Sequence, residues 1–162
     1  MSVGTAAGGF DALVEAADGA ARRLGIPGFA QIGYGRFRPR ALEWAAFLPH
    51  PELLARLAQR PLVVCHGGAG IVGEALRAGC RVVCVPRRQG TSRHHPSNDQ
   101  RAFVAALAAR FPVRVCEDPA DLESILRCAW SESAEDPPPL PRSDVPEIVA
   151  AFLRRTAAPP DQ

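Results

Sequence analysis

The stretch LVVCHGGAGIVGEALRAGCRVVCVPRR, residues 62–88, decides the fold of this chain. Its first four residues, 62–65, are apolar throughout, which is typical of a strand buried on both faces of a parallel sheet. A helical pattern over about 69–78 ends at Gly79, a residue type that favours the left-handed backbone of a helix end. Residues 81–85 repeat the buried-strand pattern. The segment therefore predicts a strand, a helix and a second strand parallel to the first.

The same alternation of apolar runs and helical repeats continues on both sides of this segment. Predicted strands cover residues 1–3, 28–33, 41–48 and 113–116, and predicted helices cover 10–24, 51–59, 98–110, 119–129 and 147–155. We expect the α/β class, with a Rossmann-like parallel sheet and helices on both faces, formed by residues 1–130. The acidic, proline-rich run after Trp130 predicts that residues 131–162 form a tether that carries the short last helix.

Composition argues against several classes of function. A net charge of +2 over 162 residues is too small to indicate nucleic-acid binding, and every basic residue is an arginine. The five cysteines form no C-x-x-C pair, which favours a reducing, cytoplasmic location over a disulfide framework. No apolar run approaches the ~18 residues of a membrane span, so contact with a membrane would need a partner or a surface patch.

The glycines of the deciding segment suit two kinds of ligand. Residues 68–73 read G-x-G-x-x-G between a strand and a helix, the fingerprint of dinucleotide binding. Arg87 and Arg88 follow the next strand, where a 2′-phosphate would be met. Against an NAD(P) site, a long stretch precedes the motif, and no acidic residue ends strand 81–85 to hold a ribose. The NAD(P) interpretation therefore remains an alternative.

Two side chains frame the glycine motif and favour a nucleotide diphosphate sugar instead. The backbone N–H groups of residues 68–71 open a helix, whose positive end suits a diphosphate, and glycines let the anion approach the main chain. His66 ends the strand and can donate a hydrogen bond to a phosphate oxygen. Glu74, about one turn into the helix, can accept hydrogen bonds from a ribose diol.

Simpler explanations exist for each of these residues. The glycines can serve only a tight turn, His66 can be a structural histidine, and Glu74 can be a solvated carboxylate. His94 and His95 suggest a metal, but no third ligand has a suitable spacing and no D-x-D motif is present, so we expect neither metal nor cofactor. Convergence favours a site, because the polar residues all follow the carboxyl ends of predicted strands.

The run H-G-G-A-G-x-x-x-E-A-L-x-x-G-x-x-x-x-x-V-P, which begins at His66, resembles the donor-binding half of GT-B glycosyltransferases. It is similar in particular to the C-terminal domain of glycosyltransferase family 28. Val-Gly-Thr at residues 3–5, F-D-x-L-V at 10–14 and Gln-Ile-Gly at 31–33 resemble a narrower group, the small catalytic subunits of two-part UDP-sugar transferases. The resemblance covers residues 2 to about 128 and implies a single GT-B donor half-domain.

The resemblance also implies roles for individual positions. The substrate-binding set that it gives is Gly4, Thr5, Phe47, Leu48, His66, Gly67, Gly68, Ala69, Gly70, Glu74, Arg87, Asn98, Asp99 and Gln100. In this set, residues 4–5 line the phosphate side of the cleft, residues 47–50 hold the uracil through ring stacking and a backbone amide, and residues 98–100 contact the donor sugar. Arg87 and Arg88 would reach phosphate or acceptor.

The resemblance implies a UDP-sugar-binding catalytic subunit of a heteromeric, inverting glycosyltransferase. Its substrates would be a hexose or N-acetylhexosamine donor and a lipid-linked or polysaccharide precursor. The chain offers no convincing general base, so a membrane-associated, acceptor-binding partner subunit is expected to supply it and to hold this cytoplasmic chain peripherally at the inner membrane. His66 would stabilise the leaving phosphate. Ile71 stands where related loops commonly carry serine or threonine, which keeps a non-catalytic, regulatory subunit as an alternative.

Overall fold

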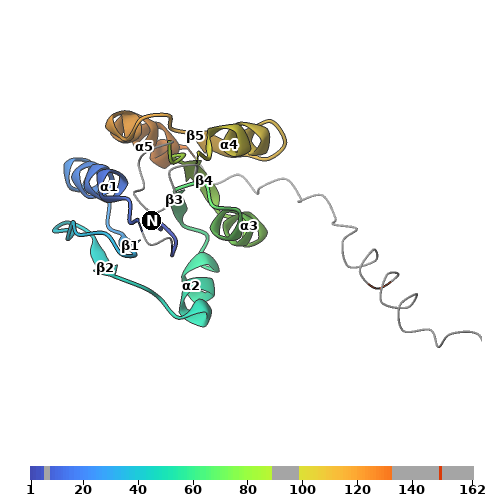
Figure 1. Ribbon diagram of the computed structural model, residues 1–162. Helices are drawn as coiled ribbons and strands as arrows, with labels where there is room; N and C mark the ends of the chain where they lie inside the picture. Colours follow the sequence, from blue (N-terminus) through green and yellow to red (C-terminus); the bar gives the residue numbers. More distant parts are fainter. Residues whose placement is uncertain (6–7, 89–98, 133–149, 151–162) are drawn as a thin grey trace, which may run out of the picture.

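The computed structural model describes residues 1–5, 8–88, 99–132 and 150 (Figure 1). Its helices are α1 (Asp11–Leu24), α2 (His50–Leu57), α3 (Ala69–Arg77), α4 (Arg101–Ala108) and α5 (Leu122–Ser131), with a 3-10 turn, η1 (Pro119–Asp121), before α5. Its strands are β1 (Phe29–Gln31), β2 (Glu43–Ala45), β3 (Leu62–Cys65), β4 (Arg81–Cys84) and β5 (Val113–Val115). The predicted alternation of strands and helices is confirmed. Apart from Ala150, the predicted helix over 147–155 lies outside the described residues.

The strands form a parallel arrangement with the amino-terminal residues at its centre. β1 pairs with β2, and β3 pairs with β4, which pairs with β5, all in parallel. Ser2 forms parallel bridges to both Gln31 and Cys65, and its N–H donates to the carbonyl of Val64 (2.9 Å). The order across the sheet is therefore β2, β1, residues 1–3, β3, β4 and β5. The predicted first strand lies between β1 and β3, although only Ser2 forms the ladder pairs.

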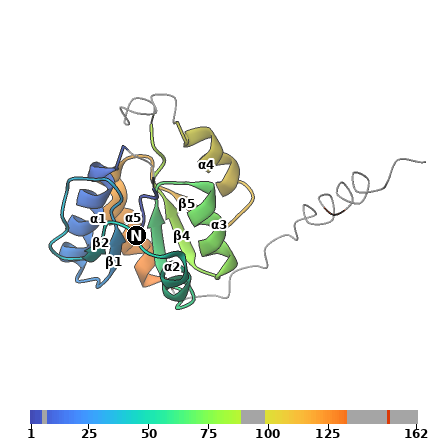
Figure 2. The same cartoon turned by 60° about the horizontal axis from the view of Figure 1, so that its bottom comes forward.

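Helices cover both faces of the sheet, as the sequence predicts (Figure 2). α1 and α5 pack together on one face, where Val64 and Val83 belong to the same apolar cluster as these helices. α2, α3 and α4 lie on the other face with Val63 and Val82. Neighbouring residues of a strand point to opposite faces, so the continuous apolar runs of β3 and β4 supply both cores. Within the described residues, no helix has the length and apolar character needed to cross a membrane.

The crossover loop, residues 32–42, joins β1 to β2 and is held by two carboxylates of α1. Asp11 accepts hydrogen bonds from the backbone N–H groups of residues 36 and 37 (2.8 and 3.2 Å). Asp18, only 7% exposed, accepts from the N–H groups of residues 40–42 (3.1, 2.8 and 2.9 Å). Burial raises the pKa of Asp18, but these hydrogen bonds outweigh it and hold the pKa below its ordinary value. The carboxylate therefore stays charged, and the loop is fixed along α1.

Candidate functional site

Loops after the carboxyl ends of the strands form one rim of the sheet, which we call the carboxyl rim. At its centre the ring of His66, after β3, lies between two glycines. A Cβ atom at Gly4 would lie 2.6 Å from Cε1 of His66, and a Cβ atom at Gly68 would lie 2.5 Å from its Nε2. Because real side chains do not approach so closely, glycine is needed at both positions to admit the imidazole. The structure thus brings together Gly4, His66 and Gly68, as the sequence predicts.

His66 is a buried and neutral imidazole. The residue is 8% exposed, and its Nδ1 atom has no hydrogen-bond partner among the residues that the structure describes. Burial, and after it the positive charge of Arg87, lower the pKa of His66 to about 4. The ring therefore offers one neutral N–H donor near pH 7 rather than a charged one. A phosphate group beside it would raise this pKa, because an anion favours the charged imidazolium.

The depressed pKa of His66 predicts a pH-dependent loss of stability. The unfolded chain binds the proton near pH 6.5 and the folded chain near pH 4, so the contribution is complete above pH 6.5 and is lost as the pH falls toward 4. Lowering the pH from 7 to 5 is expected to reduce the free energy of unfolding by about 2 kcal/mol. Urea unfolding at the two pH values measures this. The His66→Gln variant should show a smaller decrease, and an equal decrease in both proteins would contradict the assignment.

Among the described residues, no side chain caps the amino end of α3. Gly68 precedes the helix in an extended conformation and makes no side-chain capping bond, and the first turn contains no acidic residue. Ala69 and Gly70 are exposed, and the N–H of Val72 is the first to reach a helical acceptor, the carbonyl of Gly68 (3.1 Å). Ile71 packs against the core on the α3 side, which explains an apolar residue at this position. The amides of residues 69–71 are therefore suited to an anion.

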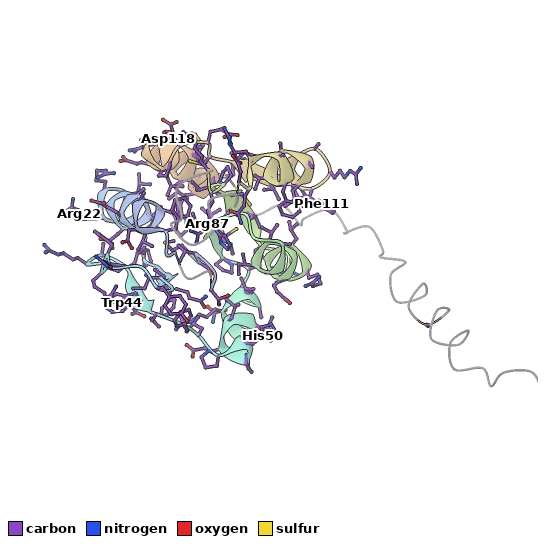
Figure 3. The ribbon with its side chains drawn as sticks, viewed as in Figure 1. Arg22, Trp44, His50, Arg87, Phe111 and Asp118 are labelled. Carbon is purple, nitrogen blue, oxygen red and sulfur yellow. The ribbon has the colours of Figure 1, made fainter. Side chains whose placement is uncertain are left out.

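Glu74 lies one turn further along α3, between a residue of the same helix and one of α2. Its Oε1 is 3.1 Å from Nη2 of Arg77 and 3.8 Å from Nε2 of His50, and its side chain is 28% exposed. His50 is the last residue of the segment 47–50 that the resemblance assigns to uracil, so the structure brings this segment next to the predicted ribose position, Glu74. Figure 3 shows His50 at the exposed start of α2.

Phe47 and Leu48 follow β2 at the same rim. The Phe47 ring is 41% exposed and meets Tyr34 edge-on, with ring centroids 4.9 Å apart. The N–H of Leu48 donates to Oε1 of the buried Gln31 (3.3 Å), so in this structure the amide predicted to pair with a base already has a partner. Sequence reasoning missed Tyr34 and Gln31. The Gly-Tyr-Gly turn after β1 is the signal that could have pointed to Tyr34.

Arg87 differs from its sequence-based prediction. The side chain is fully buried, and its guanidinium donates to the carbonyl oxygens of Val3 (3.0 Å) and Gly9 and lies over the ring of Phe10, 4.9 Å from the centroid. Figure 3 shows it in the interior. In this structure Arg87 therefore binds the loop after residues 1–3 rather than pointing outward to a phosphate or an acceptor. Arg88 is exposed and contacts Glu117 and Asp118.

Gln100 and Asp99 stand before α4, and Asn98 lies outside the described residues. Gln100 exchanges hydrogen bonds with Arg87: its N–H donates to the carbonyl of Arg87 (2.9 Å), and its Oε1 accepts from the backbone N–H of Arg87 (3.2 Å). A Cβ atom at Gly67 would meet Val104 at 2.4 Å and the Gln100 side chain at 4.0 Å, so α4 packs closely on the glycine loop. Asp99 pairs with Arg101. Thr5 is exposed at the rim.

Other features give no second centre. Among the residues that the structure describes, no group of three or more potential ligands could hold a metal ion. A mostly apolar cavity of about 580 Å³ opens near the amino ends of the strands, where Met1, Pro61 and Trp130 contribute to its lining. The carboxyl rim is the more plausible ligand site on physical grounds, because parallel sheets bind ligands beyond the carboxyl ends of their strands.

Comparisons with known proteins show the family and agree with the fold. The glycosyltransferase family 28 C-terminal domain matches residues 7–140. The crystal structure described as the glycotransferase of kitacinnamycin is similar in fold, with a TM-score of 0.59 and 22% sequence identity. The likeness covers 81% of this chain and 34% of that one, so the chain spans about a third of that protein's length. Comparison with curated proteins gave no match. On the family match, this chain belongs to the glycosyltransferase family 28 C-terminal domains.

Proposed function

We propose that the chain binds a UDP-sugar at the carboxyl rim and is the donor-binding, catalytic subunit of a heteromeric, inverting glycosyltransferase. The observation that carries this proposal is the uncapped amino end of α3, exposed beside the buried ring of His66 and the backbone of Gly4. Backbone N–H groups, a helix dipole and close-approach glycines at one point suit a diphosphate. Family membership supports a nucleotide-sugar donor as the source of that diphosphate.

The nucleoside half of the donor would lie along α3 toward α2. Glu74 is within one helical turn of the exposed amides, partly exposed, and able to accept bonds from a ribose diol. The exposed ring of Phe47 offers a stacking surface for uracil, backed by Tyr34. Pairing of uracil with the Leu48 amide would require Gln31 to release it, which the long 3.3 Å bond makes feasible.

The proposed chemistry is departure of UDP from the anomeric carbon. As the bond from that carbon to the β-phosphate oxygen breaks, negative charge grows on the phosphate, and the amides of residues 69–71 with the N–H of His66 stabilise it. The acceptor hydroxyl must lose its proton to a general base. We assign that base to a membrane-associated partner subunit, which would hold a lipid-linked or polysaccharide acceptor. The transferred group would be a hexose or N-acetylhexosamine.

Calorimetric titration of the isolated chain with UDP, UDP-glucose, UDP-N-acetylglucosamine and NADPH tests the donor site. We expect binding of the uridine nucleotides and none of NADPH. Glu74→Gln should weaken UDP binding by about 10- to 100-fold, the loss of hydrogen bonds to a charged acceptor. The matched control is Glu52→Gln, because Glu52 also pairs with an arginine one turn away, 3.2 Å distant, but lies on α2.

Two results would contradict the proposal. Binding of NADPH in preference to UDP would assign the rim to a dinucleotide, and equal UDP affinity in wild type and Glu74→Gln would remove Glu74 from the ribose site. Transfer assays with the partner subunit decide between catalysis and regulation. Restored transfer that depends on Glu74 supports a catalytic subunit, whereas transfer by the partner alone would make this chain regulatory.

A further inference from the structure

Exposed arginines line one side of the molecule, beside the edge strand β2. The arginine stripe consists of Arg22, Arg36, Arg38 and Arg40, all exposed. The last three alternate along the crossover loop with Phe37, which packs on the core, and the buried Pro39. Figure 3 shows Arg22 on α1 and Trp44 on β2 at the same margin of the molecule. The sequence R-F-R-P-R therefore turns its arginines outward together.

The backbone that carries the stripe is fixed. Asp11 and Asp18 of α1 bind the N–H groups of residues 36–37 and 40–42, and no arginine side chain takes part in these bonds. Binding to this loop would therefore cost little ordering of the backbone. The guanidinium of Arg38 also donates to the carbonyl groups of Gly35 and Phe37 (2.8 and 3.2 Å), so urea unfolding of any variant that lacks Arg38 must accompany its binding assay.

The protein balances the positive charge of the stripe only in part: the Asp18 carboxylate attracts Arg22, and Asp11 binds the backbone N–H of Arg36. Within the described part of the chain, none of its four guanidinium groups forms an ion pair with a carboxylate, although Glu15 and Glu43 are exposed on the same elements. Arginines elsewhere do: Arg23 with Glu123, Arg56 with Glu52, Arg77 with Glu74, Arg114 with Glu132 and Arg127 with Glu123. Arginines that the described residues leave without an ion pair are thus gathered along α1 and the crossover loop, although the exposed Glu15 and Glu43 belong to the same side.

Two local features match this charge to phosphate groups at a membrane surface. A surface hollow of about 420 Å³ lies between α1 and the crossover loop. Its charged lining residues are Arg22, Arg40, Arg23, which also pairs with Glu123, and the carboxylates of Glu15 and Asp18, the latter bound to backbone N–H groups of the loop. Arginine forks bind phosphate well. Beside the stripe, Trp44 is 41% exposed, with the Arg38 guanidinium 5.1 Å from its ring centroid. Tryptophan is favoured at the level of lipid headgroups.

We propose that the arginine stripe docks this domain on an anionic lipid surface, with headgroup phosphates between Arg22 and Arg40 and Trp44 at headgroup depth. A continuous anionic surface suits an extended row of unpaired arginines, whereas a protein interface would need a larger apolar centre than Trp44 provides. The proposal is independent of the donor site, because no residue of the stripe belongs to it.

Co-sedimentation of the full chain with phosphatidylcholine vesicles, with and without phosphatidylglycerol, tests this. We expect binding only to the anionic vesicles, weakened by salt. The triple variant Arg36→Gln, Arg38→Gln, Arg40→Gln should bind anionic vesicles about 100-fold more weakly, because each arginine is expected to contribute roughly a tenfold factor or less to the partition coefficient. The control Arg110→Gln, Arg114→Gln, Arg127→Gln has the same change of net charge at exposed positions on α5 and around β5, and should partition like wild type.

The other outcomes overturn the proposal. If the wild-type chain did not bind, or bound neutral vesicles equally well, an anionic lipid surface would be ruled out as the partner of the stripe. An equal loss of vesicle binding in the control variant would show that binding depends only on the net charge of the chain. Binding of soluble polyglutamate without partitioning to vesicles would assign the stripe to an acidic protein partner instead. When the chain is bound to anionic vesicles, inorganic phosphate must displace it less effectively than an excess of further anionic vesicles does. Equal displacement would mean that the hollow binds free phosphate only.

Discussion

Arg87→Met is expected to lower the free energy of unfolding by about 3–5 kcal/mol and to abolish UDP binding. Methionine retains much of the apolar stem of the fully buried arginine but leaves the carbonyl groups of Val3 and Gly9 without their donor. Each buried carbonyl that loses its hydrogen bond costs about 1–3 kcal/mol. Val3 and Gly9 would then lose their attachment to the segment after β4, and Gly4 would lose its fixed position against His66.

Urea unfolding and calorimetric titration with UDP measure the two parts of this prediction. Arg87→Lys should fall between wild type and methionine, because a single ammonium on a flexible stem cannot reproduce the planar fork that reaches both carbonyls. Arg88→Met is the neighbouring control for stability. Arg88 is exposed and 3.8 Å from Asp118, so its loss should change the free energy of unfolding by less than about 1 kcal/mol.

The same measurements separate this structural role from the sequence-based one. If Arg87 contacted the donor phosphate directly, Arg87→Met would weaken UDP binding while leaving the unfolding transition near that of wild type. A stable Arg87→Met protein that no longer binds UDP would therefore contradict the burial of the guanidinium. Loss of both properties together supports Arg87 as the residue that positions the loop opposite the glycine motif.

Arg87 also shows where sequence reasoning stops. The pattern V-P-R-R places two arginines after a strand, and the parallel topology correctly brings them to the carboxyl rim. Whether each side chain turns inward or outward depends on the backbone after Pro86 and on acceptors from residues 3 and 9, which are far away in sequence. No local period in the sequence encodes that direction. The sequence therefore gives the same expectation for the buried Arg87 and the exposed Arg88.

The parts that could be predicted depend on regular patterns. Apolar runs in β3 and β4 and the helical repeat of α1 determine the layers, and parallel strands bring His66 and Gly4 to one rim without further information. Contacts between loops could not be predicted. The Gln31–Leu48 bond and the Tyr34–Phe47 contact join segments whose relative height depends on the crossover loop and its two carboxylate anchors. Such anchors leave no periodic trace in the sequence.

Gly70→Ala is expected to stabilise the fold and yet weaken UDP binding by about 1,000-fold. Apart from its own helix backbone and chain neighbours, a Cβ atom at Gly70 meets no atom of the described residues within 4 Å. Replacing a helical glycine by alanine adds about 0.5–1 kcal/mol to the free energy of unfolding. In the proposed complex the same Cβ would stand where the diphosphate approaches the exposed amides. Loss of two charge-assisted hydrogen bonds, at about 2 kcal/mol each, gives the expected factor.

Gly73→Ala is the matched control, because Gly73 belongs to the same helix and a Cβ there makes only ordinary contact with Arg77, at 3.5 Å. Both variants should unfold at higher urea concentration than wild type, but only Gly70→Ala should lose UDP. This pair tests the plainest alternative, that the glycines serve only the turn into α3. A turn needs no open space at Gly70, so on that view the two alanines are equivalent. Equal UDP affinity in both variants would leave the motif without a ligand.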